Sequence, residues 1–247
     1  FGITGPVVLS GGSWFQNSDA TFTGPLSFAN GSLRGSGAVF LEGGGTWTNG
    51  QMLDGGRKVN RGTLTMDISG ANLLMRNGCR FENEGTVIYQ GGSQTSGGDL
   101  YLDQGSTWFN ASGALLDIQT VRELRATSGT RGVFTNEGEV RKGGEGTTST
   151  EWEFRNAGGE VNIVNSRLSL DRGGSSTGGT WSVSEGTLLR CGGETFTFDA
   201  ASTVSGAGTF EVTGGTVNFN APFGITGPVV LSGGSWFQNS DATFTGP

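Results

Sequence analysis

The sequence predicts an all-β protein built as a β-solenoid, in which the chain coils repeatedly around one axis. Three observations support this prediction. Gly makes up 48 of the 247 residues, and Gly, Ser, Thr and Asn alternate with β-branched and aromatic residues, which is typical of short strands and frequent turns. An aromatic-x-Asn motif recurs at intervals close to the length of one solenoid coil. Residues 26–221 contain no proline, which suits strands that are paired on both sides.

The first element in chain order is a strip that occurs twice. Residues 1–25 read FGITGPVVLSGGSWFQNSDATFTGP, and residues 223–247 repeat them without a change. Copies inside one ordinary domain diverge, because each packs in its own surroundings. The identity therefore predicts a tandem array, with 1–222 as one β-solenoid unit and 223–247 as the start of the next.

Within the strip, VVLS, SWFQ and ATFT read as coil strands. Residues 223–247 should therefore repeat the fold of 1–25, related to it by a shift along one axis. We expect Val229–Thr245 to stack in register on the coil that contains Thr209–Phe219. An open last coil would leave an unpaired edge, and the next unit would cover that edge.

The prolines mark the repeat seam, which we place at Pro222, Phe223 and Pro228. Because proline cannot donate to a ladder, strand pairing is expected to loosen there. All five prolines lie in the strip or directly before it: Pro6, Pro25, Pro222, Pro228 and Pro247.

The aromatic-x-Asn motif marks successive coils between the two strips. Asn at the same point of each coil favours a tight turn, because Asn tolerates left-handed φ and its amides can stack in a ladder. The alternative is that each Asn caps an unrelated hairpin turn. The intervals vary, so insertions must leave the coils as loops. The predicted turn ladder consists of Asn17, Asn30, Asn49, Asn83, Asn110, Asn136 and Asn156.

The strands expected between the strips are short and alternate apolar with polar residues, so that one face packs inward. With roughly 20–25 residues per coil, one unit would contain about ten coils and advance on the order of 50 Å. The expected strands are TLTMDI (63–68), DLYL (99–102), VNIV (161–164), LSL (168–170), WSV (181–183), TFTF (195–198) and TFEV (209–212).

Several stretches resemble the repeats of large bacterial surface and secreted proteins, namely the passengers of autotransporters and filamentous haemagglutinins. The stretches that carry this resemblance are FENEGTVIYQGG, FTNEGEVRKGG, GGTWSVSEGTLLRCGG and STVSGAGTFEVTGGTVNF. The resemblance covers nearly the whole unit. It implies a right-handed parallel β-helix and export to the cell surface, and it carries over no catalytic residue.

The sequence contains few of the residues that catalysis usually requires. The absence of histidine removes Ser-His-Asp and Cys-His nucleophiles and most catalytic zinc sites. Polysaccharide-cleaving β-helix enzymes need several carboxylates on one strand face, and the best candidates are Asp99 and Asp103. The simpler interpretation, which we favour, is that these two flank a strand and that nearby arginines form a solvated face. The charged residues that follow are Asp117, Arg122, Arg125 and Arg131.

Other ligands are not expected. The calcium-roll spacing GGxGxD is missing, and GSGAVF lacks the following helix of a dinucleotide site, so we predict no metal and no cofactor. Cys79 and Cys191 lie about five coils apart, too far to bridge within one chain. The tryptophans could stack on glycans, but their strand contexts favour the core. The residues in question are Trp14, Trp47, Trp108, Trp152 and Trp181.

Charge and pattern also limit the partners. The net charge of −7 and the lack of a basic stripe argue against nucleic acid, and no apolar run is long enough to span a membrane. We expect a structural repeat of a long extracellular fibre or adhesive stalk on a bacterial surface. Its partners would be neighbouring copies, end to end or side by side, and surface glycans. Two other functions stay open, namely a polysaccharide-cleaving lyase or glycosidase and a glycan-binding module.

Overall fold

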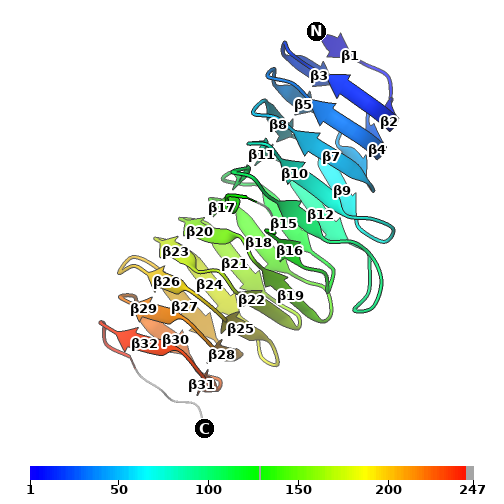
Figure 1. The fold of residues 1–247 in the computed structure, drawn as a ribbon. Helices are drawn as coiled ribbons and strands as arrows, with labels where there is room; N and C mark the ends of the chain where they lie inside the picture. The colour runs from blue at the N-terminus through cyan, green and yellow to red at the C-terminus, as the bar shows by residue number, and fades with distance from the viewer. Residues whose placement is uncertain (128, 243–247) are drawn as a thin grey trace.

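The structure is a computed structural model that describes residues 1–127 and 129–242. These residues form a parallel β-solenoid of about 11 turns and contain no helix, as the sequence predicts. Figure 1 shows the coils stacked from β1 at one end to β32 at the other, with the strands crossing the long axis. The described residues therefore contain no helix that could cross a membrane.

Each coil crosses three sides, and equivalent strands of successive coils pair in parallel along each side. We call them side 1, side 2 and side 3, in the order in which the chain visits them. Side 1 consists of β1 (Gly2–Ile3), β3 (Ala20–Phe22), β5 (Val39–Leu41), β8 (Arg57–Asn60), β11 (Arg80–Asn83), β14 (Thr107–Asn110), β17 (Val133–Asn136), β20 (Glu153–Ala157), β23 (Gly174–Thr177), β26 (Thr195–Phe198), β29 (Thr216–Phe219) and β32 (Ser235–Gln238).

Sides 2 and 3 join into one sheet, because two long strands run through the corner between them. These strands are β2 (Val7–Phe15) and β4 (Leu26–Arg34). Side 2 continues with β6 (Gly45–Trp47), β9 (Thr63–Asp67), β12 (Thr86–Gln90), β15 (Leu115–Ile118), β18 (Glu139–Lys142), β21 (Glu160–Ile163), β24 (Thr180–Val183), β27 (Thr203–Gly206) and β30 (Phe223–Ile225). Side 3 continues with β7 (Gly50–Leu53), β10 (Leu73–Arg76), β13 (Leu100–Leu102), β16 (Leu124–Arg125), β19 (Thr147–Thr150), β22 (Arg167–Leu170), β25 (Leu188–Cys191), β28 (Thr209–Val212) and β31 (Val229–Leu231).

The core is a column of apolar side chains inside the three sides. In β26, Phe196 and Phe198 point inward and are buried, whereas Thr195 is exposed. Rings of successive coils stack along the axis, for example Phe198 on Phe219 with centroids 4.4 Å apart. Each fully buried large apolar side chain contributes about 1.5–3 kcal/mol to folding.

The tryptophans belong to this core, as their strand contexts predict. Trp14 is half-buried and packs edge-on against Phe22. The fully buried tryptophans are Trp47, Trp108, Trp152 and Trp181.

Both cysteines are free and buried, in agreement with the expectation that they do not bridge. Cys79 lies in the corner before β11 on side 1, and Cys191 ends β25 on side 3. Burial raises the pKa of each thiol to about 12.

Two inward positions hold lysines, which the sequence analysis did not anticipate. The Lys58 ammonium donates to the carbonyls of Leu53 at 2.7 Å and Gly56 at 2.9 Å, at the corner that leads into its own strand. The Lys142 ammonium donates to the carbonyl of Gly144 at the next corner after its strand. Both side chains are buried, and burial lowers the pKa of Lys142 to about 8. Each lysine therefore replaces an apolar core residue with a clamp on turn carbonyls.

Candidate functional site

A ladder of asparagine amides lines the corner between side 1 and side 2. In four successive steps, an amide Nδ2 donates to the Oδ1 of the asparagine in the next coil, each time at 2.8 Å. The members are the last residues of four side-1 strands and the Asn of β20: Asn60, Asn83, Asn110, Asn136 and Asn156. All five side chains are buried.

The same amides also fasten the start of side 2. Nδ2 of Asn83 donates to the carbonyl of Leu115 at 2.9 Å, and Nδ2 of Asn110 donates to the carbonyl of Glu139 at 3.0 Å. Each acceptor is the first residue of a side-2 strand in the following coil. Because all the amide dipoles point the same way, neighbouring bonds polarise one another. The ladder thus fixes both the spacing of the coils and the angle of the corner.

Four of the seven predicted asparagines lie in this ladder, and three do not. Asn17, Asn30 and Asn49 belong to other corners, because the aromatic residue that precedes each of them lies on side 2 or side 3. Asn30 and Asn49 instead accept a hydrogen bond from the amide of the next glycine, at 2.8 and 2.6 Å. For these three residues the prediction of one common ladder is wrong.

The ladder contains one asparagine that the aromatic-x-Asn motif does not identify. The backbone φ of its members also differs from the left-handed φ that the sequence predicts. Asn60 follows Lys58-Val59, so the aromatic residue of the motif is replaced by the buried lysine. Its distance of 23 residues from Asn83 is the signal that would have revealed it. None of the five has a left-handed φ; the described non-glycine residues that do are Asp54, Asn77, Gln104, Ser166 and Glu194. Amide stacking, rather than tolerance of positive φ, explains these asparagines.

At the repeat seam, residues 223–242 continue the solenoid. The register pairs Phe210 with Val229 on side 3 and Val217 with Trp236 on side 1. Val229–Ala242 therefore stacks on the coil that contains Thr209–Phe219; the remaining residues of that prediction, 243–245, lie outside the described residues. The Trp236 ring stacks on Phe219 with centroids 4.8 Å apart.

The two copies of the strip share a left-handed φ at Gly12 and Gly234, but they occupy different sides. Phe1 lies opposite Ala20 on side 1, whereas Phe223 lies opposite Ala242 on side 2. Residues 7–9 form part of side 2, but their copies 229–231 form part of side 3. The expected relation by a shift along one axis is therefore wrong, because the shift is combined with a rotation from one side to the next.

The prolines of the seam do not interrupt the backbone hydrogen bonds between the strands of neighbouring coils. Pro222 directly precedes β30 and Pro228 directly precedes β31, which are positions where no donor to the ladder is needed. The Pro228 carbonyl accepts a hydrogen bond from the Phe210 amide at 3.0 Å, and Phe223 pairs with Val204. The expectation that pairing loosens at the seam is wrong for this reason.

Asp99 and Asp103 flank β13 on side 3, and both carboxylates are buried. Oδ1 of Asp99 lies 3.1 Å from Nη2 of Arg122 and accepts a hydrogen bond from the Glu123 amide at 3.2 Å. Oδ1 of Asp103 accepts a hydrogen bond from the Thr127 amide at 2.8 Å. These contacts reach into the following coil, so the two carboxylates hold neighbouring coils together.

The other charged candidate site residues do not all lie on the same side of the solenoid. Nη1 of Arg125 lies 3.6 Å from Asp99, whereas Arg131 pairs with Glu194 at 2.8 Å. Asp117 belongs to β15 on side 2 and accepts a hydrogen bond from Gln119. The six residues therefore do not converge on one point. Because Arg122 and Arg125 are partly buried in ion pairs, the expected solvated face is wrong for them.

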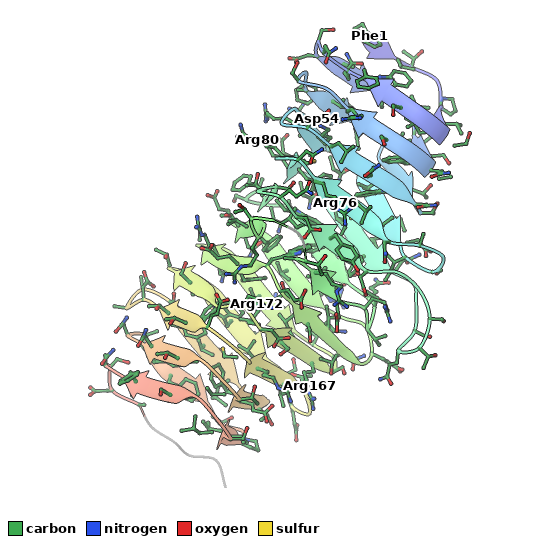
Figure 2. The ribbon with its side chains drawn as sticks, in the orientation of Figure 1. Phe1, Asp54, Arg76, Arg80, Arg167 and Arg172 are labelled. Atoms are coloured by element: carbon green, nitrogen blue, oxygen red, sulfur yellow. The ribbon has the colours of Figure 1, made fainter. Side chains whose placement is uncertain are left out.

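The outer face of side 1 is hollowed over several coils. One hollow of about 440 Å³ surrounds the half-buried ring of Phe109, with the arginines Arg80 and Arg155 in its lining. A second hollow of about 480 Å³ is lined by Arg131, Arg172 and other residues further along the same face. Figure 2 labels Arg80, which lines the first hollow, and Arg172, which lines the second.

Charge on this face is mostly paired. Arg155 contacts Glu153 at 2.7 Å and Arg131 contacts Glu194 at 2.8 Å, whereas Arg80 makes no ion pair with any described residue. The described residues also contain no group of three or more His, Cys, Asp or Glu side chains placed to hold a metal ion.

No protein-family model, curated protein or solved structure matches this chain. Of what the resemblance to exported bacterial repeats implies, only the fold is therefore supported. The molecule is a parallel β-solenoid.

Proposed function

We propose that this chain is a structural repeat of a long extracellular fibre or adhesive stalk on a bacterial surface. Units of 222 residues would stack end to end, and function would come from length, stiffness and self-stacking. The observation that carries the proposal is the second copy of the strip, which continues the solenoid on the preceding coil through paired strands on all three sides.

The first unit shows how the strip is covered when further coils follow it. Leu9 is 4% exposed because β4 lies over it, whereas its copy Leu231 is 58% exposed. In a second unit the copy of Phe28 would cover Leu231, because Phe28 pairs with Leu9 in the first unit.

The test is a chain in which residues 1–222 precede a full 1–247 sequence. Small-angle X-ray scattering should show one straight rod that is about 50 Å longer than the single chain. A matched variant carries Leu→Asp at the internal copy of Leu9, where the charge would be buried. The rod formed by this variant should bend at the seam or be cleaved there by a protease. A parent two-unit chain that behaves as two independently tumbling bodies would contradict the proposal.

Extracellular placement rests on the likeness of FENEGTVIYQGG and related stretches to exported repeats. On intact cells that produce the full protein, added protease should remove the repeat while cytoplasmic proteins stay whole. Protection of the repeat until the cells are lysed would contradict this placement.

Glycan binding is a second candidate function, favoured by the arginine-lined hollow around Phe109. An aromatic ring beside guanidinium groups suits stacking and charged hydrogen bonds to an acidic sugar. A glycan array should show binding that Phe109→Ala weakens. Phe237→Ala is the matched control, because Phe237 is an exposed ring outside this hollow. Equal binding by both variants would contradict a site in this hollow.

We propose that the protein is not an enzyme. The supporting observation is that Asp99 and Asp103 bind backbone amides of the next coil. Incubation with common polysaccharides should release no unsaturated or reducing sugar. Release that is abolished by Asp99→Asn in a variant that still folds would overturn this.

A further inference from the structure

The length of the repeat unit does not correspond to a whole number of coils. Following the register of side 1 upward from Ala20, ten successive pairings lead to Trp236. Trp236 is the copy of Trp14 on side 3, however, and the copy of Ala20 is Ala242, one strand further along. One unit therefore consists of ten coils and one additional strand.

The connection at the seam leaves no alternative placement. Only residues 220–222 separate β29 on side 1 from β30, and three residues reach only the next side of the solenoid. Local geometry is preserved across the displacement. The indole Nε1 of Trp14 donates to Oε1 of Gln16 at 3.1 Å, and Trp236 donates to Gln238 at the same distance.

We infer that successive units are turned by one third of a turn about the fibre axis, in addition to the twist of the solenoid itself. The inference rests on the tandem array proposed above. Side 1 of each unit continues side 2 of the preceding unit. The partner of the open end is a second copy of this sequence, whose residues 26–34 cover the strip as β4 covers β2.

This rotation distributes the features of side 1 around the fibre. The asparagine ladder and the hollow around Phe109 face one direction in the first unit and the other two directions in the second and third. Apart from the twist of the solenoid, the fourth unit repeats the first after about 150 Å, at about 4.8 Å per coil. A fibre of three or more units therefore presents the same hollow on every side.

The seam itself can be tested in the full chain with two cysteine pairs. A Cβ placed on Gly224 lies 3.5 Å from Cβ of Ser205 on side 2, which is within the range that a disulfide needs, about 3.5–4.5 Å. Ser205→Cys with Gly224→Cys should therefore close on oxidation. Asn218→Cys with Gly224→Cys is the control, because Asn218 is the side-1 residue that would neighbour Gly224 in an unrotated array. Closure of the control pair in place of the first would overturn the inference.

The array is tested with a chain of three units followed by residues 223–247, imaged by electron cryomicroscopy. We expect a rod in which the Asn60–Asn156 ladder of each unit stands in line with the corner between side 2 and side 3 of the unit before it. A rod with that ladder in line from unit to unit would overturn the rotation and leave the proposed fibre intact. A chain broken at its seams would overturn the proposed fibre and the rotation together, while closure of the Ser205–Gly224 pair reports on the single seam.

Discussion

Leu9 and Leu231 show at the scale of one residue how the next coil decides burial. They occupy the same place in two identical strips, with the same neighbours along the chain. The difference in their exposure comes from β4, which covers Leu9 and has no counterpart over Leu231. Sequence identity therefore does not imply equal energetic importance in this molecule.

The first prediction uses this pair. Leu9→Ala should lower the free energy of unfolding by about 2–4 kcal/mol, because it opens a cavity under β4. Leu231→Ala in the single chain should cost less than about 1 kcal/mol, because its side chain is largely in solvent. Urea titrations of both variants measure the difference, and equal losses would refute it.

Lys142 gives a second prediction, about pH. Its pKa is about 8 in the folded state and would return to 10.5, its ordinary value, on unfolding. Above pH 8 the unfolded chain therefore binds the proton more strongly than the folded chain, and folding gains stability as the pH rises towards 10.5. Below pH 8 the ammonium is charged in both states, and the full cost of burying it remains.

The measurement compares the parent with Lys142→Met at pH 7 and pH 9.5. The parent should gain about 1–2 kcal/mol relative to the variant over this interval. Cys79 and Cys191, whose folded pKa values are raised to about 12, lower the stability of both proteins above pH 9 and cancel in the comparison. A stability difference that is independent of pH would show that Lys142 titrates normally in the fold.

At the scale of an element, the corner between side 1 and side 2 is the most strongly specified part of a coil. Its asparagines satisfy one another and also bind the first carbonyl of a side-2 strand. Removing one member therefore leaves buried polar groups without partners in two neighbouring coils, and such groups are costly.

Asn110→Ala tests the ladder at its centre. It removes the acceptor of Asn83 and the donor to Asn136, so we expect a loss of about 2–4 kcal/mol in the free energy of unfolding. Asn30→Ala is the control, because Asn30 is exposed and should change stability by about 0.5 kcal/mol or less. A similar small effect for both would show that the ladder contributes little.

The strands themselves could be predicted from the sequence, because inward and outward residues alternate. TFTF and TFEV coincide with β26 and β28. The side on which a strand lies could not be predicted, since all three sides share this alternation. Because of that ambiguity, the motif groups Asn17, Asn30 and Asn49 with the ladder, and the sequence gives no sign of the rotation at the seam.

The candidate site was predictable to a lesser degree. Four ladder asparagines follow an aromatic residue, and the motif finds them; Asn60 follows Lys58, and the motif does not. The roles of Asp99 and Asp103 depend on amides of Glu123 and Thr127, which are 24 residues away in the chain. A local pattern contains no information on which amide such a distant coil will present.

At the scale of the whole molecule, each coil contacts mainly the coils directly before and after it. Stability is then a sum of coil and interface contributions, and unfolding begins at the ends, where one neighbour is missing. Cys191 is two coils from the last described coil, whereas Cys79 is four coils from the first.

The rate at which each buried thiol becomes accessible therefore measures unfolding from the ends of the solenoid. Under native conditions a thiol reagent should label Cys191 before Cys79, as mass spectrometry of the labelled chain would show. In the two-unit chain, Cys191 of the first unit is interior and should become as slow as Cys79. Simultaneous labelling of both cysteines in the single chain would mean that it opens only as a whole.

The hydrogen bonds between coils run along the same axis as the molecule, while the strands lie across it. A pull on the two ends therefore does not shear a whole sheet at once; it loads the few bonds of the outermost coil and peels that coil away before the next. Each coil of roughly 20 residues that peels off releases about 70 Å of chain in place of about 4.8 Å of rod. Under tension the protein would lengthen in small steps and dissipate work at each one, and the chain could rewind when the load falls.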